Sequence, residues 1–188
     1  IYLSNFYGLK EVSQYWENVL LINNWQKKRI SKLVVEKLFG TINNKKIAIL
    51  GFSFKANTND TRESAAIDIT KELLSEGAQI VINDPKVNQE QICVDLNKKP
   101  YKKNTNNSSE KGYWWFSNDF EEVFTNADAI LVLTEWEEYK KLDWDKLSKL
   151  MRKPAWIFDS RSIVDPNKIK TLGVKFWKIG DGTLNESI

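Results

Sequence analysis

Residues 51–64 read Gly51-Phe52-Ser53-Phe54-Lys55-Ala56-Asn57-Thr58-Asn59-Asp60-Thr61-Arg62-Glu63-Ser64, and they indicate the architecture of the whole chain. This loop follows a short apolar run, Lys46–Leu50, and precedes a helical pattern. A strand, a polar loop and a helix N-terminus form the arrangement with which open α/β sheets hold anionic ligands. The loop carries two cations, Lys55 and Arg62, but its single glycine excludes a dinucleotide fingerprint and a P-loop. We therefore expect a phosphorylated ligand here, bound in another geometry.

Outward from this loop, strands and helices alternate. Short apolar runs predict strands at Lys46–Leu50, Gln79–Asn83, Asp128–Leu133, Trp156–Asp159 and Val174–Lys178. Between the first two strands, a capping box at Asp60–Glu63 predicts the start of a helix that continues to about Glu76. Four further helices are predicted over Asp119–Thr125, Glu137–Leu142, Trp144–Met151 and Pro166–Leu172. Parallel strands joined by helices form right-handed βαβ units. The pattern therefore predicts an α/β, Rossmann-like, doubly wound and mainly parallel sheet.

The first 40 residues follow a helical pattern instead. An apolar stripe recurs at three- and four-residue steps in Val12, Trp16, Val19 and Leu20. We expect a helical segment over residues 1–44, with a soft break at Asn23-Asn24, and a second domain over 45–188. Part of the apolar helical face should be exposed and should favour a homo-oligomer. The basic residues Lys27, Lys28, Arg29 and Lys32 fit either a solvated face, the commoner case, or a ligand site.

Residues 97–112 interrupt the alternation of strands and helices. This segment is polar and aperiodic, and it cannot bury enough apolar area to offset its ordering entropy. We therefore expect a flexible surface insertion whose lysines are solvated. The aromatic run Trp114-Trp115-Phe116 follows it. Such a run re-enters the core more often than it stacks on a base.

Composition argues against several classes of protein. The net charge of +3 is small and the lysines are dispersed, which argues against nucleic-acid binding. No apolar stretch approaches the ~20 residues that span a membrane. The chain has no histidine and one cysteine, Cys93, so we expect no metal site. Cys93 lies in an apolar setting that indicates a structural thiol, and a lone cysteine suits a reducing, cytoplasmic compartment.

Cations at the carboxyl ends of the predicted strands are the candidate binding residues. Ligands of open α/β sheets gather outside these ends, where the loops 51–64, 134–136 and 159–161 fall. Lys55 and Arg161 are expected to converge on one anion, the guanidinium as a bidentate donor and the ammonium as a point charge. The alternative for Arg161 is a salt bridge to Asp159 or Asp165, and spacing alone leaves both interpretations open.

Several loops, in their order along the chain, resemble the UDP-glucose/GDP-mannose dehydrogenase family. The motifs are Gly51–Lys55 with Asn57–Ser64, Asn83–Val87, Val132–Trp136, Pro154–Arg161 and Glu11–Trp16. The likeness covers nearly the whole chain, is nearest to the UDP-glucose branch and departs mainly at residues 97–112. Ser160 stands where the family commonly has a glycine.

The resemblance implies an enzyme that oxidises C6 of UDP-glucose to a carboxylate with two NAD+ molecules. By analogy Phe54, Lys55 and Arg161 bind the substrate, Arg62 reaches NAD, and residues 45–188 form the UDP-binding domain. The resemblance places the catalytic cysteine and the glycine-rich NAD fingerprint upstream of Ile1, and Cys93 does not match the nucleophile. We therefore expect a C-terminal fragment with no catalytic residue, inactive alone and partnered by the N-terminal half of the same enzyme.

Two alternatives stay open beside this hypothesis. One is a dehydrogenase of another sugar nucleotide, such as GDP-mannose or a UDP-N-acetylhexosamine. The other is a non-catalytic module that binds sugar nucleotides or assists assembly. Because the chain begins with Ile1 rather than Met, we expect a piece of a longer protein, which disfavours the separate module.

Overall fold

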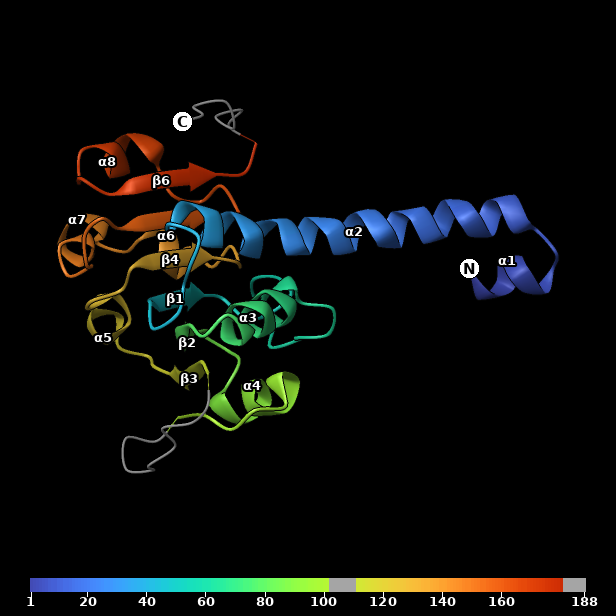
Figure 1. Ribbon diagram of the computed structural model, residues 1–188, viewed down its shortest axis with the longest axis horizontal. Helices are drawn as coiled ribbons and strands as arrows, with labels where there is room; N and C mark the ends of the chain where they lie inside the picture. The colour runs from blue at the N-terminus through green and yellow to red at the C-terminus, as the bar shows by residue number, and fades with distance from the viewer. Residues whose placement is uncertain (102–110, 181–188) are drawn as a thin grey trace.

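The computed structural model describes residues 1–101 and 111–180, and within them six strands form one sheet. Its strands are β1 (Lys46–Leu50), β2 (Gln79–Asn83), β3 (Tyr113–Phe116), β4 (Ala129–Val132), β5 (Trp156–Asp159) and β6 (Lys175–Lys178). The order is β3-β2-β1-β4-β5-β6, with every neighbouring pair parallel (Figure 1). The predicted doubly wound α/β fold is confirmed, and the described sheet is parallel throughout. The strand order reverses between β1 and β4, which is where such folds bind ligands.

Helices cover both faces of the sheet. The described helices are α1 (Tyr2–Phe6), α2 (Lys10–Lys37), α3 (Ala65–Ser75), α4 (Gln89–Leu96), α5 (Phe120–Phe124), α6 (Glu137–Lys140), α7 (Trp144–Ser148) and α8 (Pro166–Lys170). One core lies between the sheet and α2, α3 and α4, and the other lies beneath α5 to α8. Residues of β1 alternate between the two cores, with Ile47 and Ile49 in the first and Ala48 and Leu50 in the second. This two-sided burial explains why β1 reads as a continuous apolar run.

Helix α2 is one continuous helix that projects far beyond the sheet (Figure 1). The break predicted at Asn23-Asn24 is wrong, because both residues lie inside α2 and are exposed. An exposed asparagine lowers helix stability by well under ~1 kcal/mol, which is too little to end a long helix. The second half of α2 packs on the sheet, where Ile30 and Val34 are buried.

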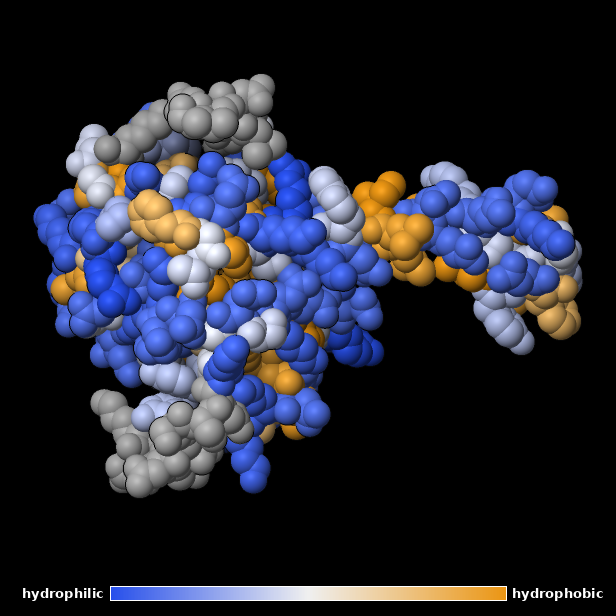
Figure 2. Space-filling model, in the orientation of Figure 1, coloured by the Kyte–Doolittle hydropathy of each residue, from blue (hydrophilic) through white to orange (hydrophobic). Residues whose placement is uncertain are grey.

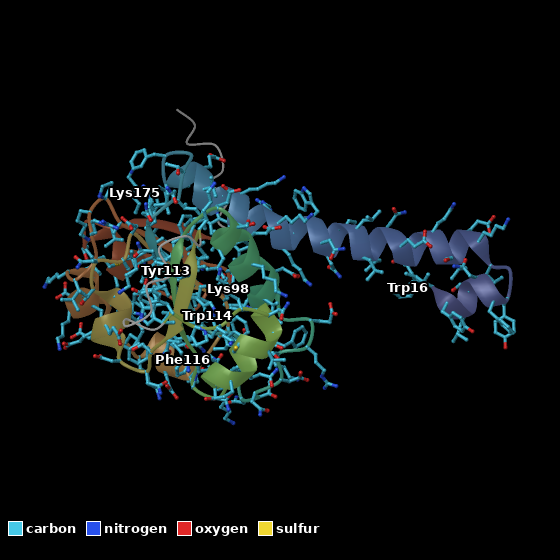
Figure 3. All side chains as sticks on the ribbon, turned by 60° about the horizontal axis from the view of Figure 1, so that its bottom comes forward. Trp16, Lys98, Tyr113, Trp114, Phe116 and Lys175 are labelled. Atoms are coloured by element: carbon cyan, nitrogen blue, oxygen red, sulfur yellow. The ribbon has the colours of Figure 1, made fainter. Side chains whose placement is uncertain are left out.

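The first half of α2, together with α1, has no covering element among the described residues. Its large apolar side chains are exposed, as Figure 2 shows for orange atoms on the projecting arm and Figure 3 for Trp16 near its tip. They are Tyr2, Leu3, Phe6, Tyr7, Leu9, Val12, Tyr15, Trp16, Leu20, Leu21, Ile22 and Trp25. The predicted exposed apolar helical face is therefore confirmed. The predicted division into residues 1–44 and 45–188 stays a prediction, since the end of α2 shares a core with the sheet.

The predicted capping box at the start of α3 is wrong. The N-cap is Ser64, whose Oγ accepts a hydrogen bond from the backbone N–H of Ala66 at 3.3 Å. Asp60 is engaged elsewhere, because its carboxylate accepts from the backbone N–H of Arg62 at 3.0 Å and from its guanidinium at 2.7 Å. A sequence pattern cannot show which of two nearby donors an aspartate chooses.

Two elements near the outer edge of the sheet have no predicted counterpart, α4 and β3. Helix α4 carries Cys93, a free and partly buried cysteine packed against the core. In β3, Trp114 is fully buried and its Nε1–H donates to the carbonyl of Lys98 at 3.0 Å (Figure 3). The predicted return of the aromatic run to the core is confirmed for Trp114. The insertion predicted at about 97–112 lies mostly outside the described residues.

Candidate anion-binding site

A buried carboxylate fixes the loop that follows β1, residues 51–64. Asp84, immediately after β2, is buried, and its Oδ2 accepts hydrogen bonds from the backbone N–H groups of Phe52 at 2.7 Å and Ser53 at 3.0 Å. The indole N–H of buried Trp136 donates to the same oxygen at 3.3 Å, so Trp136 packs at the mouth of the sheet. The start of the loop is therefore held by groups that need no ligand.

The switch point between β1 and β4 is tightly packed. Gly51 has φ +94°, and a Cβ atom there would lie 2.4 Å from the Cβ of Thr134 and 2.8 Å from its backbone nitrogen. The Thr134 hydroxyl donates to the carbonyl of Ser53 at 2.8 Å, and the Ser64 hydroxyl donates to the carbonyl of Phe52 at 2.8 Å. Gly51, the single glycine of this loop, thus allows the loop backbone to approach Thr134 closely, and it does not form part of a phosphate-binding turn.

Arg161 is oriented by residues at the carboxyl ends of β5 and β4. Asp159, the last residue of β5, accepts from the backbone N–H of Arg161 at 2.9 Å and from that of Val164 at 2.8 Å, which shapes the turn. The side-chain Nε–H of Arg161 donates to the carbonyl of Leu133 at 2.7 Å, and Glu135 Oε2 lies 3.4 Å from the same nitrogen. In the described part of the chain, the ion-pair partner of Arg161 is thus Glu135. The alternative prediction, a salt bridge to Asp159 or Asp165, is wrong.

The terminal nitrogens of Arg161 remain available. Across residues 1–101 and 111–180, neither of these nitrogens donates a hydrogen bond, although the guanidinium as a whole is paired with Glu135. Because Nε is held by the end of β4, the fork of the guanidinium is presented in one orientation. Such a fork matches the geometry of a phosphate or a carboxylate.

Arg161 lines a cavity of about 260 Å³ between α2 and the carboxyl edge of the sheet. Its walls include Gln26, Lys27 and Ile30 of α2, and Phe54, Leu133 and Arg161 from the loops that follow β1, β4 and β5. The volume is at the low end for small-molecule pockets, so it suits a diphosphate or one ring rather than a whole nucleotide sugar. A larger ligand would extend beyond the cavity.

The predicted site residues do not all reach this cavity. Phe54 lines it together with Arg161, and the Phe54 ring is 49% exposed, so it is available to a ligand. Lys55 is exposed, follows Phe54 directly and is not among the lining residues. Convergence of Lys55 and Arg161 on one anion therefore stays a prediction.

Arg62 lies outside the cavity on the same loop. Its side chain is 88% exposed and pairs with Asp60 at 2.7 Å. The hydrogen bonds from the Arg62 guanidinium, and then that from its backbone N–H, lower the pKa of Asp60 to about 2. Arg62 is thus a tethered surface cation, free to exchange its partner because the pair is solvated.

Lys27 lines the cavity and belongs to the basic stretch for which the sequence favoured a solvated face but left a ligand site open. Its side chain is 20% exposed, and its Nζ lies 3.0 Å from Asp68 and 3.7 Å from Glu63. The sequence alone could not show which of the four basic residues at positions 27–32 faces the cavity, because only the packing of α2 on the sheet turns Lys27 inward. The next residue in the sequence, Lys28, is exposed.

The part of the chain that the structure describes holds no group of three or more His, Cys, Asp or Glu side chains that could bind a metal ion. None of its helices combines the length and the apolar character that crossing a bilayer requires.

Comparison with known proteins gives consistent matches. The family model described as "UDP-glucose/GDP-mannose dehydrogenase family, UDP binding domain" matches residues 48–166. UDP-glucose 6-dehydrogenase 4 of Arabidopsis thaliana is 42% identical over 96% of this chain and 39% of its own length. UDP-glucose 6-dehydrogenase of Bos taurus is 41% identical over 96% of this chain and 36% of its own length. The chain thus spans well under half the length of these curated relatives.

A solved structure shows the same architecture. The NDP-N-acetyl-D-galactosaminuronic acid dehydrogenase of Methanosarcina mazei superposes with a TM-score of 0.61 and 25% identity. The superposition covers 82% of this chain and 28% of that one. The likeness extends from the sequence motifs to the spatial arrangement of the sheet and its helices.

Proposed function

The chain belongs to the UDP-glucose/GDP-mannose dehydrogenase family, and from this premise we propose that it is the substrate-binding part of a UDP-glucose 6-dehydrogenase. In this proposal residues 45–188 bind UDP-glucose at the carboxyl edge of the sheet. The single observation that carries it is the Arg161 guanidinium, which is held through Nε by the carbonyl of Leu133 and lines a cavity together with Phe54. A preoriented guanidinium binds a diphosphate with little loss of side-chain entropy.

Each substrate-binding residue has a distinct role in the proposal. Arg161 donates to the diphosphate, Phe54 provides apolar contact beside it, and Lys55 adds a mobile positive charge from the rim. Because Lys55 does not line the cavity, it would reach a part of the ligand that extends outside.

The parent reaction is the oxidation of UDP-glucose to UDP-glucuronate with two NAD+, and we assign no catalytic residue to this chain. NAD, when bound, accepts the hydride. The residue proposed to meet it is Arg62, whose exposed guanidinium suits a pyrophosphate at the rim of the site. The rest of the cofactor contacts would come from the length of the relatives that this chain does not span. We therefore propose that the chain alone does not turn over.

Assembly belongs to the same proposal. The exposed apolar side chains of α1 and the first half of α2 would be covered by the N-terminal half of the enzyme and by a second subunit. Contiguous exposed apolar surface of this kind marks protein interfaces. We thus propose a homo-oligomer in the cytoplasm.

A second candidate is a dehydrogenase of a different sugar nucleotide. It is favoured by the superposition on a dehydrogenase of an N-acetylated sugar nucleotide. The UDP-glucose dehydrogenases are much nearer in sequence, at 41–42% identity against 25%. Titration of the parent enzyme with UDP-glucose, GDP-mannose and UDP-N-acetylhexosamines would rank these substrates.

The binding proposal is tested by calorimetry of UDP with the 188-residue chain. Arg161→Ala is expected to weaken UDP binding by about ten- to a hundredfold, as for loss of hydrogen bonds to a charged group. Lys55→Ala is expected to weaken it by about two- to fivefold, as for an exposed ion pair. Lys149→Ala, on exposed α7-flanking surface, is the matched control. Equal UDP affinity in Arg161→Ala and the control would place the site elsewhere.

A further inference from the structure

We propose that Lys27 of α2 is a second cation of the anion site and that it binds the diphosphate in the cavity that Arg161 also lines. The inference deepens the proposed function and rests on it for the identity of the ligand. It assigns a ligand-binding role to α2, which none of the loop motifs covers. The chemical class of ligand is a pair of linked phosphates, which offers one anionic group to each cation.

The position of Lys27 supports this role. Lys27 and Arg161 line one cavity, the first from α2 and the second from the loop after β5. The side chain of Lys27 is 20% exposed, compared with 36% for Arg161, so both cations are partly withdrawn from water. Charges in such an environment are screened less than surface charges and attract an anion more strongly.

The present partners of Lys27 leave it capacity for a ligand. An ammonium carries three donor protons. Asp68 Oδ2 lies 3.0 Å from the ammonium as its nearer ion-pair partner, whereas Glu63 Oε2, at 3.7 Å, lies beyond hydrogen-bonding distance. The Glu63 side chain is 88% exposed, so this second ion pair is weak and easily exchanged. A phosphate oxygen could therefore replace Glu63 while Asp68 continues to hold the ammonium in place.

The two cations are held in different ways, which divides their tasks. Arg161 is fixed by Leu133 and offers a rigid fork, whereas Lys27 is a point charge on a flexible stem, anchored by Asp68. A rigid donor selects the geometry of one phosphate, and the flexible donor adapts to the second. A ligand with a single phosphate would use only one of them well.

The experiment uses the full chain and two neighbouring lysines. Lys27→Met and Lys28→Met remove the same charge at successive positions of α2, but only Lys27 lines the cavity. Isothermal titration with UDP, uridine and inorganic pyrophosphate measures each affinity. We expect Lys27→Met to weaken UDP and pyrophosphate by about three- to tenfold and uridine by less than about twofold. Lys28→Met should leave all three within about twofold.

A conservative variant separates binding from folding. Lys27→Arg keeps the charge and should retain UDP affinity within about threefold, whereas a purely structural lysine would show the same loss in both variants. The UDP affinity should also depend less steeply on salt in Lys27→Met than in Lys28→Met, because one contact with the phosphates is lost. Circular dichroism of each variant confirms that α2 is intact.

The outcomes distinguish the inference from the function on which it rests. Equal UDP affinity in Lys27→Met and Lys28→Met, with Arg161→Ala weakened, would overturn the role of Lys27 and leave the binding proposal standing. Pyrophosphate bound as tightly as UDP, with both weakened in Lys27→Met, would support the cation pair and refute recognition of the nucleotide. No binding of either ligand by the unmodified chain would refute both.

Discussion

The carboxylate of Asp84, immediately after β2, accepts a 2.7 Å hydrogen bond from the backbone N–H of Phe52, immediately after Gly51. Through this contact one strand end fixes the loop of its neighbour. The consequence is a preformed path for residues 52–54, which lead to the cavity. Asp84, which does not itself line the cavity, therefore stabilises the loop that provides Phe54 to the cavity wall.

Substitution of Asp84 by asparagine should destabilise the fold. The carboxamide retains one accepting oxygen and places an NH2 group against backbone N–H donors, so at least one buried amide loses its partner. We expect the free energy of unfolding to fall by about 2–4 kcal/mol, measured by urea denaturation. Asp145→Asn, on an exposed helix, should change it by less than about 0.5 kcal/mol. A similar small loss in both variants would contradict the anchoring role.

Replacement of Gly51 by alanine should be more damaging than the same change at Gly173. Both glycines have positive φ, +94° and +64°, but a Cβ at Gly51 meets Thr134 at 2.4 Å whereas one at Gly173 meets nothing within 4 Å. We expect a loss of about 1–2 kcal/mol at Gly173 from backbone strain. The loss at Gly51 should exceed about 3 kcal/mol, since overpacking adds to the strain. Denaturation of the two variants in parallel gives the difference, and equal losses would refute the close approach.

Asp60 should titrate with a pKa of about 2 rather than the ordinary 3.8. Because folding depresses this pKa, the stabilisation by the pair with Arg62 is fully present above about pH 4 and is lost as the pH falls through about 2. Carbon-13 NMR of the Asp60 carboxyl group reads the pKa directly. In Arg62→Gln the pKa should return toward 3.8. If it stays near 2 in that variant, Arg62 is not the cause.

The exposed stripe on α2 should drive self-association of the isolated chain. Trp16 and Leu20 are 50% and 53% exposed and lie one helical turn apart. Introducing glutamate at both positions should shift sedimentation velocity profiles toward the monomer, because charge burial opposes an apolar contact. Gln14→Glu adds a charge to the opposite side of the same helix and serves as the control. Concentration-independent sedimentation of the unmodified chain would exclude this association.

The three strands that match their predicted bounds are those with the simplest signal. Lys46–Leu50, Gln79–Asn83 and Trp156–Asp159 are short apolar runs bounded by polar turns, and two-sided burial leaves little choice of register. Helix α4 gave no comparable signal. It spans eight residues, and Val94 in its last turn is exposed, so its apolar periodicity is faint. Strand β3 has only four residues and directly follows a polar segment, so the sequence pattern did not predict a strand there.

The location of the anion-binding site could be predicted in part, because it follows from the topology of the sheet. The topology of parallel strands brings their carboxyl ends to one edge, which led the sequence to predict that Lys55 and Arg161 converge there, whereas Phe54 was expected only from the family resemblance. The inward turn of Lys27 and the choice of Glu135 beside Arg161 depend on how α2 docks and on which acceptor lies nearest in space. Spacing along the chain carries no information about either contact.

Helix α2 carries the cavity wall and the exposed apolar arm on one unbroken rod. Lys27 lies about 25 Å from the start of that helix at 1.5 Å per residue, so a tilt of about 5° at the cavity moves the tip by about 2 Å. If the proposed ligand and subunit contacts both form, a change in the tilt of α2 at Lys27 would also shift the position of Trp16, because one rigid helix carries both residues.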